Sequence, residues 1–262
     1  MANSINTNYG ANVALQTLNA TNKALATTQN RISTGQSVSS AKDNGALFAI
    51  ATNQRAEMSA LGSVKQSLQR GQTIVDVALA AGDTVVNALT EMKALAVAIE
   101  ADGTTTSASY LALKEDYDAF QTEIDNALAG ATFDGVNLFT ATAPTAVKIN
   151  TAATGDTYNI GFTGATTVKP TTATAADVDT ALKGFTAKLA TLGTQSKSLE
   201  RTTTFTSKME DALEAGIGNL VDADLAKESA KLTALQTKQQ LGVQALSIAN
   251  SSSQILLSLF RS

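Results

Sequence analysis

The sequence lacks histidine, cysteine and tryptophan altogether, and its 262 residues include only two prolines. Without cysteine the chain can form neither a disulfide bond nor a thiol-based active site. Without histidine it lacks the usual general base near neutral pH and the commonest protein ligand for metal ions. Aspartate, glutamate, lysine and serine can support catalysis alone, but these absences favour a protein that is not an enzyme. They also predict no metal and no cofactor.

Charge is scarce as well, because only 16% of the residues are Asp, Glu, Lys or Arg, and the net charge is −4. No cluster of lysine and arginine offers a surface for phosphates, so we expect no nucleic acid as a partner. Residues 1–15 have neither a basic start nor a continuous apolar run, and they therefore predict no cleavable signal peptide.

Both end segments are free of charged residues: residues 1–22 and 239–260 contain no Lys, Arg, Asp or Glu. Each segment mixes Leu, Ile and Val with Asn, Gln, Ser and Thr, which is too polar for a membrane span. Such segments suit helices that are covered by other protein on several sides. This pattern points to assembly with other chains.

The rest of the sequence is dominated by helical spacing of apolar residues. We expect helices over residues 4–33, 46–101 and 107–129, and from Asp177 to about Leu259 with a break near Val221. Gly35 suits the left-handed end of the first helix, and Asp177 suits an N-cap. Within the second helix a 4-3 spacing, typical of coiled coils, joins Ile74, Ala78, Ala81, Val85, Ala88, Met92, Leu95 and Ile99.

Residues 132–176 differ from the helical parts, because they are rich in Thr, Ala and Gly and hold both prolines. Residues 147–149 and 158–160 alternate like short strands around residues 151–156, which predicts a β-hairpin. The fold class is therefore mainly α, with long antiparallel helices in a coiled-coil or rod-like bundle and a small β-hairpin insertion. An antiparallel pairing of the helical halves would bring Ile99 near Val178 and the two charge-free ends together.

The acidic residues Asp222, Asp224 and Glu228 resemble the start of a calcium-binding loop. Such a loop needs Gly at its sixth position and Glu at its twelfth, but this chain has Lys227 and Thr233 there. An N-cap followed by an acidic first helical turn explains these residues better.

Apolar side chains of the end segments are the candidate functional residues, because a charge-free helix can pack against copies of itself without desolvating charge. Near the C-terminus they cover almost every side of one helix. The predicted assembly interface consists of Ile5, Leu15, Leu18, Leu25, Ile32, Leu246, Ile248, Ile255, Leu256, Leu259 and Phe260.

Several short segments resemble, in order, those of bacterial flagellins. They are Ile5-Asn6-Thr7-Asn8, Arg31-Ile32-Ser33-Thr34-Gly35, Ser40-Ala41-Lys42-Asp43-Asn44, Leu95-Ala96-Val97, Phe133-Asp134-Gly135-Val136, Asp222-Ala223-Asp224 and Gln254-Ile255-Leu256-Leu257-Ser258-Leu259. Each segment alone is weak, but together they are specific. They cover about residues 1–140 and 177–262, and the matched form is a short flagellin without large outer domains, similar to those of alphaproteobacteria.

The resemblance implies a domain plan and a structural role. Residues 1–35 and 226–262 would form an inner coiled-coil domain that lines a filament channel. Residues 36–225 would form a rod-like helical domain with its β-hairpin at about 132–176. The protein would be a structural subunit that polymerises, alone or with other flagellins, into the flagellar filament for swimming motility.

The resemblance also implies partners and a location. Export would use the flagellar type III apparatus and a secretion chaperone without a cleaved signal, and the linker at 27–40 contributes to export recognition in relatives. Filament cap and hook-junction proteins would be further partners, and the protein would be extracellular. In flagellins sensed by the animal Toll-like receptor, an Arg contacts the receptor where this chain has Glu91, beside the retained contact Leu95, which predicts weak sensing.

Two other functions remain open at this stage. A hook-filament junction protein would share the same ends but add few copies to the flagellum. A secreted surface adhesin or glycan carrier would instead display residues 132–176. Long regular filaments of the purified protein would favour the filament subunit over both alternatives.

Overall fold

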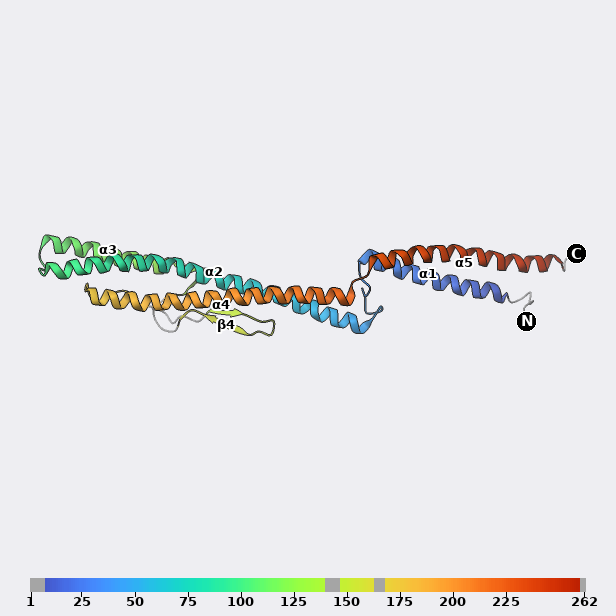
Figure 1. Cartoon of the computed structure of the whole chain (residues 1–262), viewed down its shortest axis with the longest axis horizontal. Coiled ribbons are helices and arrows are strands. Elements are labelled where there is room, and N and C mark those ends of the chain that lie inside the picture. Colours follow the sequence, from blue (N-terminus) through green and yellow to red (C-terminus); the bar gives the residue numbers. More distant parts are fainter. Residues whose placement is uncertain (1–7, 140–146, 163–167, 260–262) are drawn as a thin grey trace. The chain divides into compact units, whose positions relative to one another are not determined.

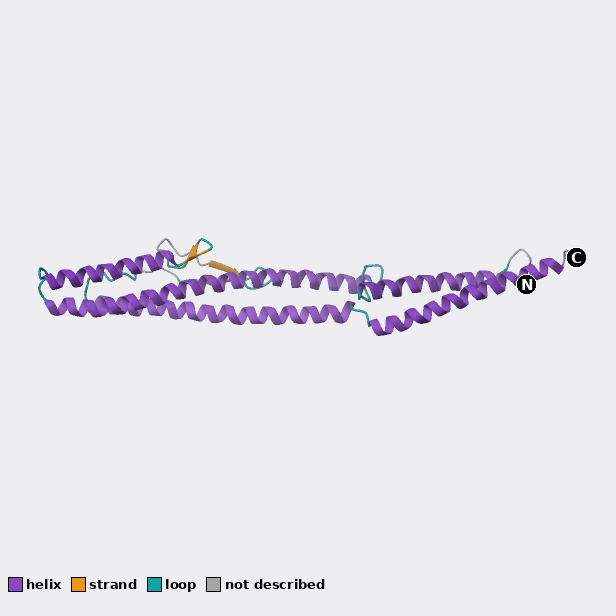
Figure 2. Cartoon of the chain, turned by 90° about the horizontal axis from the view of Figure 1, so that it is seen from above, coloured by secondary structure: helices purple, strands orange, loops and turns teal. Residues whose placement is uncertain are grey.

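The computed structural model describes residues 8–139, 147–162 and 168–259, and it describes side chains as far as Ser251. The elements in these ranges are α1 (Tyr9–Thr34), α2 (Gly45–Asp102), α3 (Ala108–Gly130), β1 (Thr132–Phe133), β2 (Val136–Asn137), β3 (Val147–Asn150), β4 (Thr157–Ile160), α4 (Ala175–Val221) and α5 (Leu225–Leu259). Figure 2 shows the dominance of helix and the small share of strand. The mainly α fold with small antiparallel sheets is thus confirmed.

The chain forms two compact units, each built from segments distant in sequence. Residues 1–56 and 213–262 make the first unit, and residues 57–212 make the second. Within the second unit, α3 lies along α2, and α4 runs beside α2 (Figure 1).

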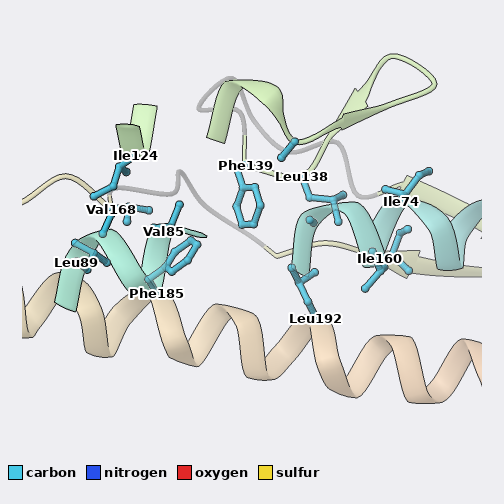
Figure 3. Close-up of a cluster of buried hydrophobic side chains, with 14 of the residues drawn as sticks. Ile74, Val85, Leu89, Ile124, Leu138, Phe139, Ile160, Val168, Phe185 and Leu192 are labelled. Atoms are coloured by element: carbon cyan, nitrogen blue, oxygen red, sulfur yellow. The ribbon is translucent and has the colours of Figure 1, made fainter. Parts of the chain in front are cut away.

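The core of the 57–212 unit follows the heptads of α2. Ile74, Val85, Met92 and Ile99 are all buried, as the 4-3 spacing predicts. Figure 3 shows Phe185 and Leu192 of α4 reaching this stripe, together with Ile124 of α3 and the side chains of Leu138, Phe139 and Ile160. Each such burial contributes about 1.5–3 kcal/mol relative to exposure. The core is therefore shared among helices, hairpin and connecting segments.

Ion pairs show that α2 and α4 are antiparallel, as the sequence predicts. Lys93, late in α2, lies 2.5 Å (Nζ to Oδ1) from Asp179 early in α4. Lys65, earlier in α2, lies 3.1 Å (Nζ to Oε2) from Glu210 late in α4. Hydrogen bonds from Lys183 first, and then from Lys93, lower the pKa of Asp179 to about 2. Asp179 therefore stays ionised at neutral and mildly acidic pH.

The predicted β-hairpin is present, with β3 and β4 paired from Val147↔Ile160 to Asn150↔Thr157. It docks on α2 and on α4. Ile149 is buried against the helix at Gly71, and Gln195 of α4 binds both backbone groups of Gly161. The Gln195 amide donates to the Gly161 carbonyl at 2.7 Å and accepts from its N–H at 2.9 Å. These contacts fix the hairpin to the helices.

Gly71 leaves the space that Ile149 occupies, so its replacement tests the docking. A Cβ at Gly71 would lie 2.8 Å from Ile149 Cγ1, whereas a Cβ at Gly62 in the same helix would meet nothing closer than 3.8 Å. Overpacking costs about 1–3 kcal/mol, and Gly→Ala in a helix otherwise gains about 0.5–1 kcal/mol. We expect Gly71→Ala to lower the melting temperature and the control Gly62→Ala to raise it. If both variants shifted the melting temperature in the same direction, the result would contradict the docking of the hairpin at Gly71.

The helix ends agree with the sequence except at one cap. Gly35 ends α1 with φ +71°, and Asp224 caps α5 by accepting a hydrogen bond from the Lys227 N–H at 3.0 Å. The prediction of an N-cap at Asp177 is wrong, because α4 begins at Ala175 and Asp177 lies in its first turn. The Thr174 hydroxyl accepts from the Asp177 N–H at 3.3 Å and fills the capping role instead. Threonine is nearly as good an N-cap as aspartate, so residue type alone does not decide between Thr174 and Asp177. The residue that caps α4 is set by where its first turn begins.

A second, smaller hairpin was not predicted. In it Phe133 pairs with Val136, and Asp134 and Gly135 form the turn with φ values of +50° and +74°. Two-residue strands leave no alternating pattern in a sequence, although Asp-Gly is a common hairpin turn.

Among the described helices, α2 is the one that is long and apolar enough, by length and composition, to cross a membrane. The same helix supplies Leu68, Val75 and Leu89, which are completely buried in the 57–212 unit. Its apolar character therefore follows from its place in the protein core.

Candidate functional site

Helices α1 and α5 of the first unit form an antiparallel pair (Figure 1). The Asn8 side chain, which also caps α1, donates to the Ala249 carbonyl at 2.7 Å. Ten residues before Ala249 in α5, the Gln239 amide donates to Asn22 Oδ1 at 2.8 Å. The two charge-free ends therefore lie together, as predicted.

The pair buries little apolar surface of its own. Its fully buried positions in α1 are Thr21 and Thr28, one heptad apart, and not leucines. The Thr21 hydroxyl satisfies itself by donating to the Thr17 carbonyl at 2.9 Å. Leu18 packs close to Gly242 of α5, where a Cβ would lie 3.3 Å from Leu18 Cδ1. Small residues thus bring the two backbones close together.

Large apolar side chains of the pair face outward instead. Leu15 is 45% exposed, and Ile248 is 69% exposed. The other exposed large apolar residues on these two helices are Tyr9, Val13, Leu225, Leu241 and Val243. Unpaired apolar surface of this kind marks a site of association with protein.

The predicted interface residues divide into three groups in the structure. Leu15 and Ile248 are exposed. The half-buried members are Leu18, Leu25, Ile32 and Leu246. Ile5 and Phe260 lie outside the described residues, and Ile255, Leu256 and Leu259 lie where only the backbone of α5 is described.

An ion pair joins the last turn of α1 to the first turn of α5. Arg31 Nη1 of α1 donates to Glu228 Oε1 of α5 at 3.2 Å, and Lys231 Nζ lies 3.8 Å from the other carboxylate oxygen. Only 11% of the Glu228 side chain is exposed. Burial raises the pKa of Glu228, but the Arg31 hydrogen bond and the Lys231 charge outweigh it, and the net pKa is lowered. The pair therefore stabilises the folded state above the ordinary glutamate pKa, and this contribution is lost as pH falls through the lowered value.

Removing Arg31 would leave Glu228 enclosed without its main partner. We expect Arg31→Ala to weaken the α1/α5 pair by about 1–3 kcal/mol, seen as faster amide hydrogen exchange in α1 at pH 7. Lys23→Ala removes an exposed cation of the same helix and should change little. The difference between wild type and Arg31→Ala should shrink in acid, as Glu228 becomes protonated. Equal exchange in all three proteins at pH 7 would show that the ion pair contributes nothing.

Two connections of the chain meet beside this pair. The Ser37 N–H donates to the Val221 carbonyl at 2.7 Å, and the Ala223 N–H donates to the Gly35 carbonyl at 2.9 Å. The linker that follows is closed by Asp43. Ser40 first, and then Ser39, donate to the Asp43 carboxylate and hold its pKa below the usual value. The linker is thus an ordered segment tied to the connection between α4 and α5.

The residues predicted for receptor contact lie on a different surface. Glu91 is exposed and Leu95 is half-buried on α2, and both line a groove of about 450 Å³ between α2 and α3. Across the part of the chain that the structure describes, no group of three His, Cys, Asp or Glu is arranged to hold a metal ion.

Comparison with known proteins decides what this arrangement belongs to. The family model for the bacterial flagellin N-terminal helical region matches residues 5–143, and the model for the C-terminal helical region matches residues 175–260. This chain is a member of the bacterial flagellin family.

Individual relatives give the same result over the whole length. Flagellin FljK of Caulobacter vibrioides is 52% identical, with 99% of each chain covered. The flagellin of Brucella melitensis is 37% identical over 98% of this chain and 99% of its own. Flagellin C of Rhizobium meliloti is 31% identical over 98% of this chain and 99% of its own.

This flagellin is therefore a filament subunit of the bacterial flagellum, and it is a structural, non-enzymatic protein. It polymerises with flagellin subunits, and its location is the extracellular filament. The result selects the filament subunit over the junction protein and the adhesin that the sequence left open.

Proposed function

We propose that the paired helices α1 and α5 are the surface through which this flagellin polymerises. The observation that carries the proposal is that a helix pair with charge-free end segments buries threonines inside and leaves Leu15 and Ile248 exposed. In the filament, pairs from neighbouring subunits cover these side chains. Because no charge has to be desolvated along most of the pair, dense helix packing costs little.

The same proposal assigns the domains. Residues 1–35 and 226–262 form the inner coiled-coil domain around the filament channel, and residues 36–225 form the rod-like domain. The burial of large side chains supports this assignment. The twelve largest fully buried side chains of the described residues all lie between 57 and 212, so the rod has a core of its own.

Before assembly the exposed apolar residues of α5 need protection from water. A secretion chaperone fits that role, and the flagellar export apparatus would then pass the chain out without a cleaved signal. The filament cap would contact the same helix pair at the distal end of the filament. The hook-junction proteins would contact it at the base. Membership of the flagellin family supports these partners, as it supports mixed polymers with other flagellins.

Growth of filaments from purified protein tests the proposed surface. Monomers added to short filament fragments should lengthen them, as seen by electron microscopy, with a sharp critical concentration. Hydrogen exchange of α1 and α5 should slow on incorporation, because both helices become covered. Filaments in which these amides exchange as fast as in the monomer would exclude the helix pair as the interface.

Glu91 supports a separate prediction about the animal Toll-like receptor for flagellin. Relatives that are sensed present an Arg there, and a carboxylate cannot make the bidentate hydrogen bonds of a guanidinium. We expect purified monomer to activate receptor-reporter cells weakly, and Glu91→Arg to recover part of the signal. Strong activation by the unmodified monomer would show that this position does not decide sensing.

A further inference from the structure

The groove between α2 and α3 has an apolar floor and an acidic rim. Leu95, Ala119 and Phe120 form the floor, and Glu91, Asp116 and Glu123 are the rim carboxylates. None of these three acids has a salt bridge within the described residues, whereas their neighbours Asp118 and Asp125 are paired with lysines. The rim therefore carries unpaired negative charge around an apolar centre.

The acidity is local and not a property of the whole chain. Between Glu91 and Asp125 there are eight acidic residues and only two lysines, while the entire chain has a net charge of −4. The remainder of the molecule is consequently basic overall. A basic partner surface for the groove can thus be sought on the same chain.

Helix α4 carries a stripe of basic residues around an exposed aromatic side chain. Phe205 is 60% exposed, and the exposed cations Lys197, Arg201 and Lys208 share its side of the helix, since their spacing matches 3.6 residues per turn. This side lies opposite the one that buries Leu199. The three cations form no salt bridge in the described part of the chain, and Glu200 lies a quarter-turn away at the edge of the stripe.

The groove and the stripe match in spacing as well as in charge. On α3, Asp116, Phe120 and Glu123 stand at steps of four and three residues; on α4, Arg201, Phe205 and Lys208 stand at the same steps. At 1.5 Å per residue, each charged pair is about 10.5 Å apart along its helix. An aromatic anchor flanked by two cations thus faces an apolar floor flanked by two carboxylates.

We propose that the α4 stripe of one subunit docks in the α2/α3 groove of a second copy of this chain. Phe205 lies on the floor formed by Leu95, Ala119 and Phe120, and Arg201 and Lys208 pair with Asp116 and Glu123. The contact joins two different surfaces of identical chains, and such a heterologous contact extends into an open helical polymer when it does not close a ring. It rests on the polymer proposed above and adds a contact between its rods.

Engineered disulfide bonds can trap this contact, because the chain has no cysteine of its own. In filaments of the double variant Ala119→Cys, Phe205→Cys, mild oxidation should produce a ladder of covalent dimers, trimers and longer chains on denaturing gels. The control variant Asp125→Cys, Phe205→Cys places the first thiol on the side of α3 opposite the groove, since Asp125 lies about half a turn around the helix from Asp116 and Glu123, and it should give no ladder. A disulfide requires Cα atoms within about 7 Å, so the ladder reports direct contact.

Charge reversal provides a second test that does not depend on cysteine. We expect Asp116→Arg with Glu123→Arg, or Arg201→Glu with Lys208→Glu, to raise the critical concentration about tenfold or more. All four substitutions together should return it to within about threefold of wild type, since the charges complement one another again. These positions are exposed, so monomer melting should stay unchanged.

The outcomes separate this contact from the polymer itself. Filaments without a ladder, an equal ladder from the control pair, or a fourfold variant no better than either charge-reversed pair would overturn the groove contact and leave the filament role intact. Failure of the unmodified chain to form filaments on seeds would overturn the polymerisation proposal, and this inference with it.

Discussion

A flagellin chain shortened to residues 31–229 is expected to remain a helical, cooperatively folded monomer and to form no filament. The deletion removes most of α1 and α5, including Leu15 and Ile248 of the proposed interface. It leaves the whole 57–212 unit, whose buried side chains include Tyr117 and Phe185. Each large buried side chain contributes about 1.5–3 kcal/mol, and we expect the remaining core to suffice for folding.

Circular dichroism and electron microscopy together measure both halves of this expectation. The fragment should show a helical spectrum and a cooperative thermal transition, and it should not lengthen filament seeds at concentrations where the full chain does. An unfolded fragment would show that the rod depends on the ends. Filaments of the fragment would show that assembly does not need the paired helices.

The second large effect is expected from a charge placed on the exposed side of α5. Ile248 is 69% exposed in the monomer, so Ile248→Asp should change monomer melting very little. In the filament the same carboxylate would be enclosed in a segment that has no basic partner within residues 239–260. An unpaired buried charge costs about 3 kcal/mol or more, which is roughly a hundredfold in critical concentration.

Leu111→Asp is the matched control, because Leu111 is 58% exposed on α3, which is not one of the paired helices, and it does not line the groove. Sedimentation of filaments at a series of protein concentrations gives the critical concentration of each variant. Equal values for Ile248→Asp and wild type would mean that this side of α5 stays in solvent in the filament.

Much of the fold could be predicted because its signals are local and periodic. The 4-3 spacing from Ile74 to Ile99 predicts the buried stripe of α2, and the structure confirms it. The alternation around residues 151–156 predicts the hairpin, whose strands are β3 and β4. The predicted break near Val221 is confirmed, because α4 ends at that residue and Asp224 then caps α5.

The interior of the α1/α5 pair could not be predicted, because it breaks the rule that the apolar stripe is the buried one. Thr21 and Thr28 are buried, and Leu15 of the predicted heptad is exposed. Small side chains allow close helix packing, and the leucines remain available for partners outside the chain. A periodicity argument detects that a helix is amphipathic, but it does not show which of two adjoining faces meets which partner.

Long-range pairings were also beyond the sequence pattern. Arg31 and Glu228 are 197 residues apart and meet only because α1 and α5 are antiparallel. The groove at Glu91 and Phe120 likewise requires the relative placement of α2 and α3. Spacing along one helix contains no information about a neighbouring helix, so the sequence pattern could not place Glu91 of α2 beside Phe120 of α3.

Electron cryo-microscopy of the native filament, at a resolution that shows side chains, tests the central claim most directly. We expect α1 and α5 of adjacent subunits to form the innermost layer, with Leu15 and Ile248 buried between copies. The rod-like domain of residues 36–225 should lie outside that layer. A filament in which α1 and α5 face solvent on the outer surface, or in which Ile248 contacts no neighbouring subunit, would contradict the proposed assembly.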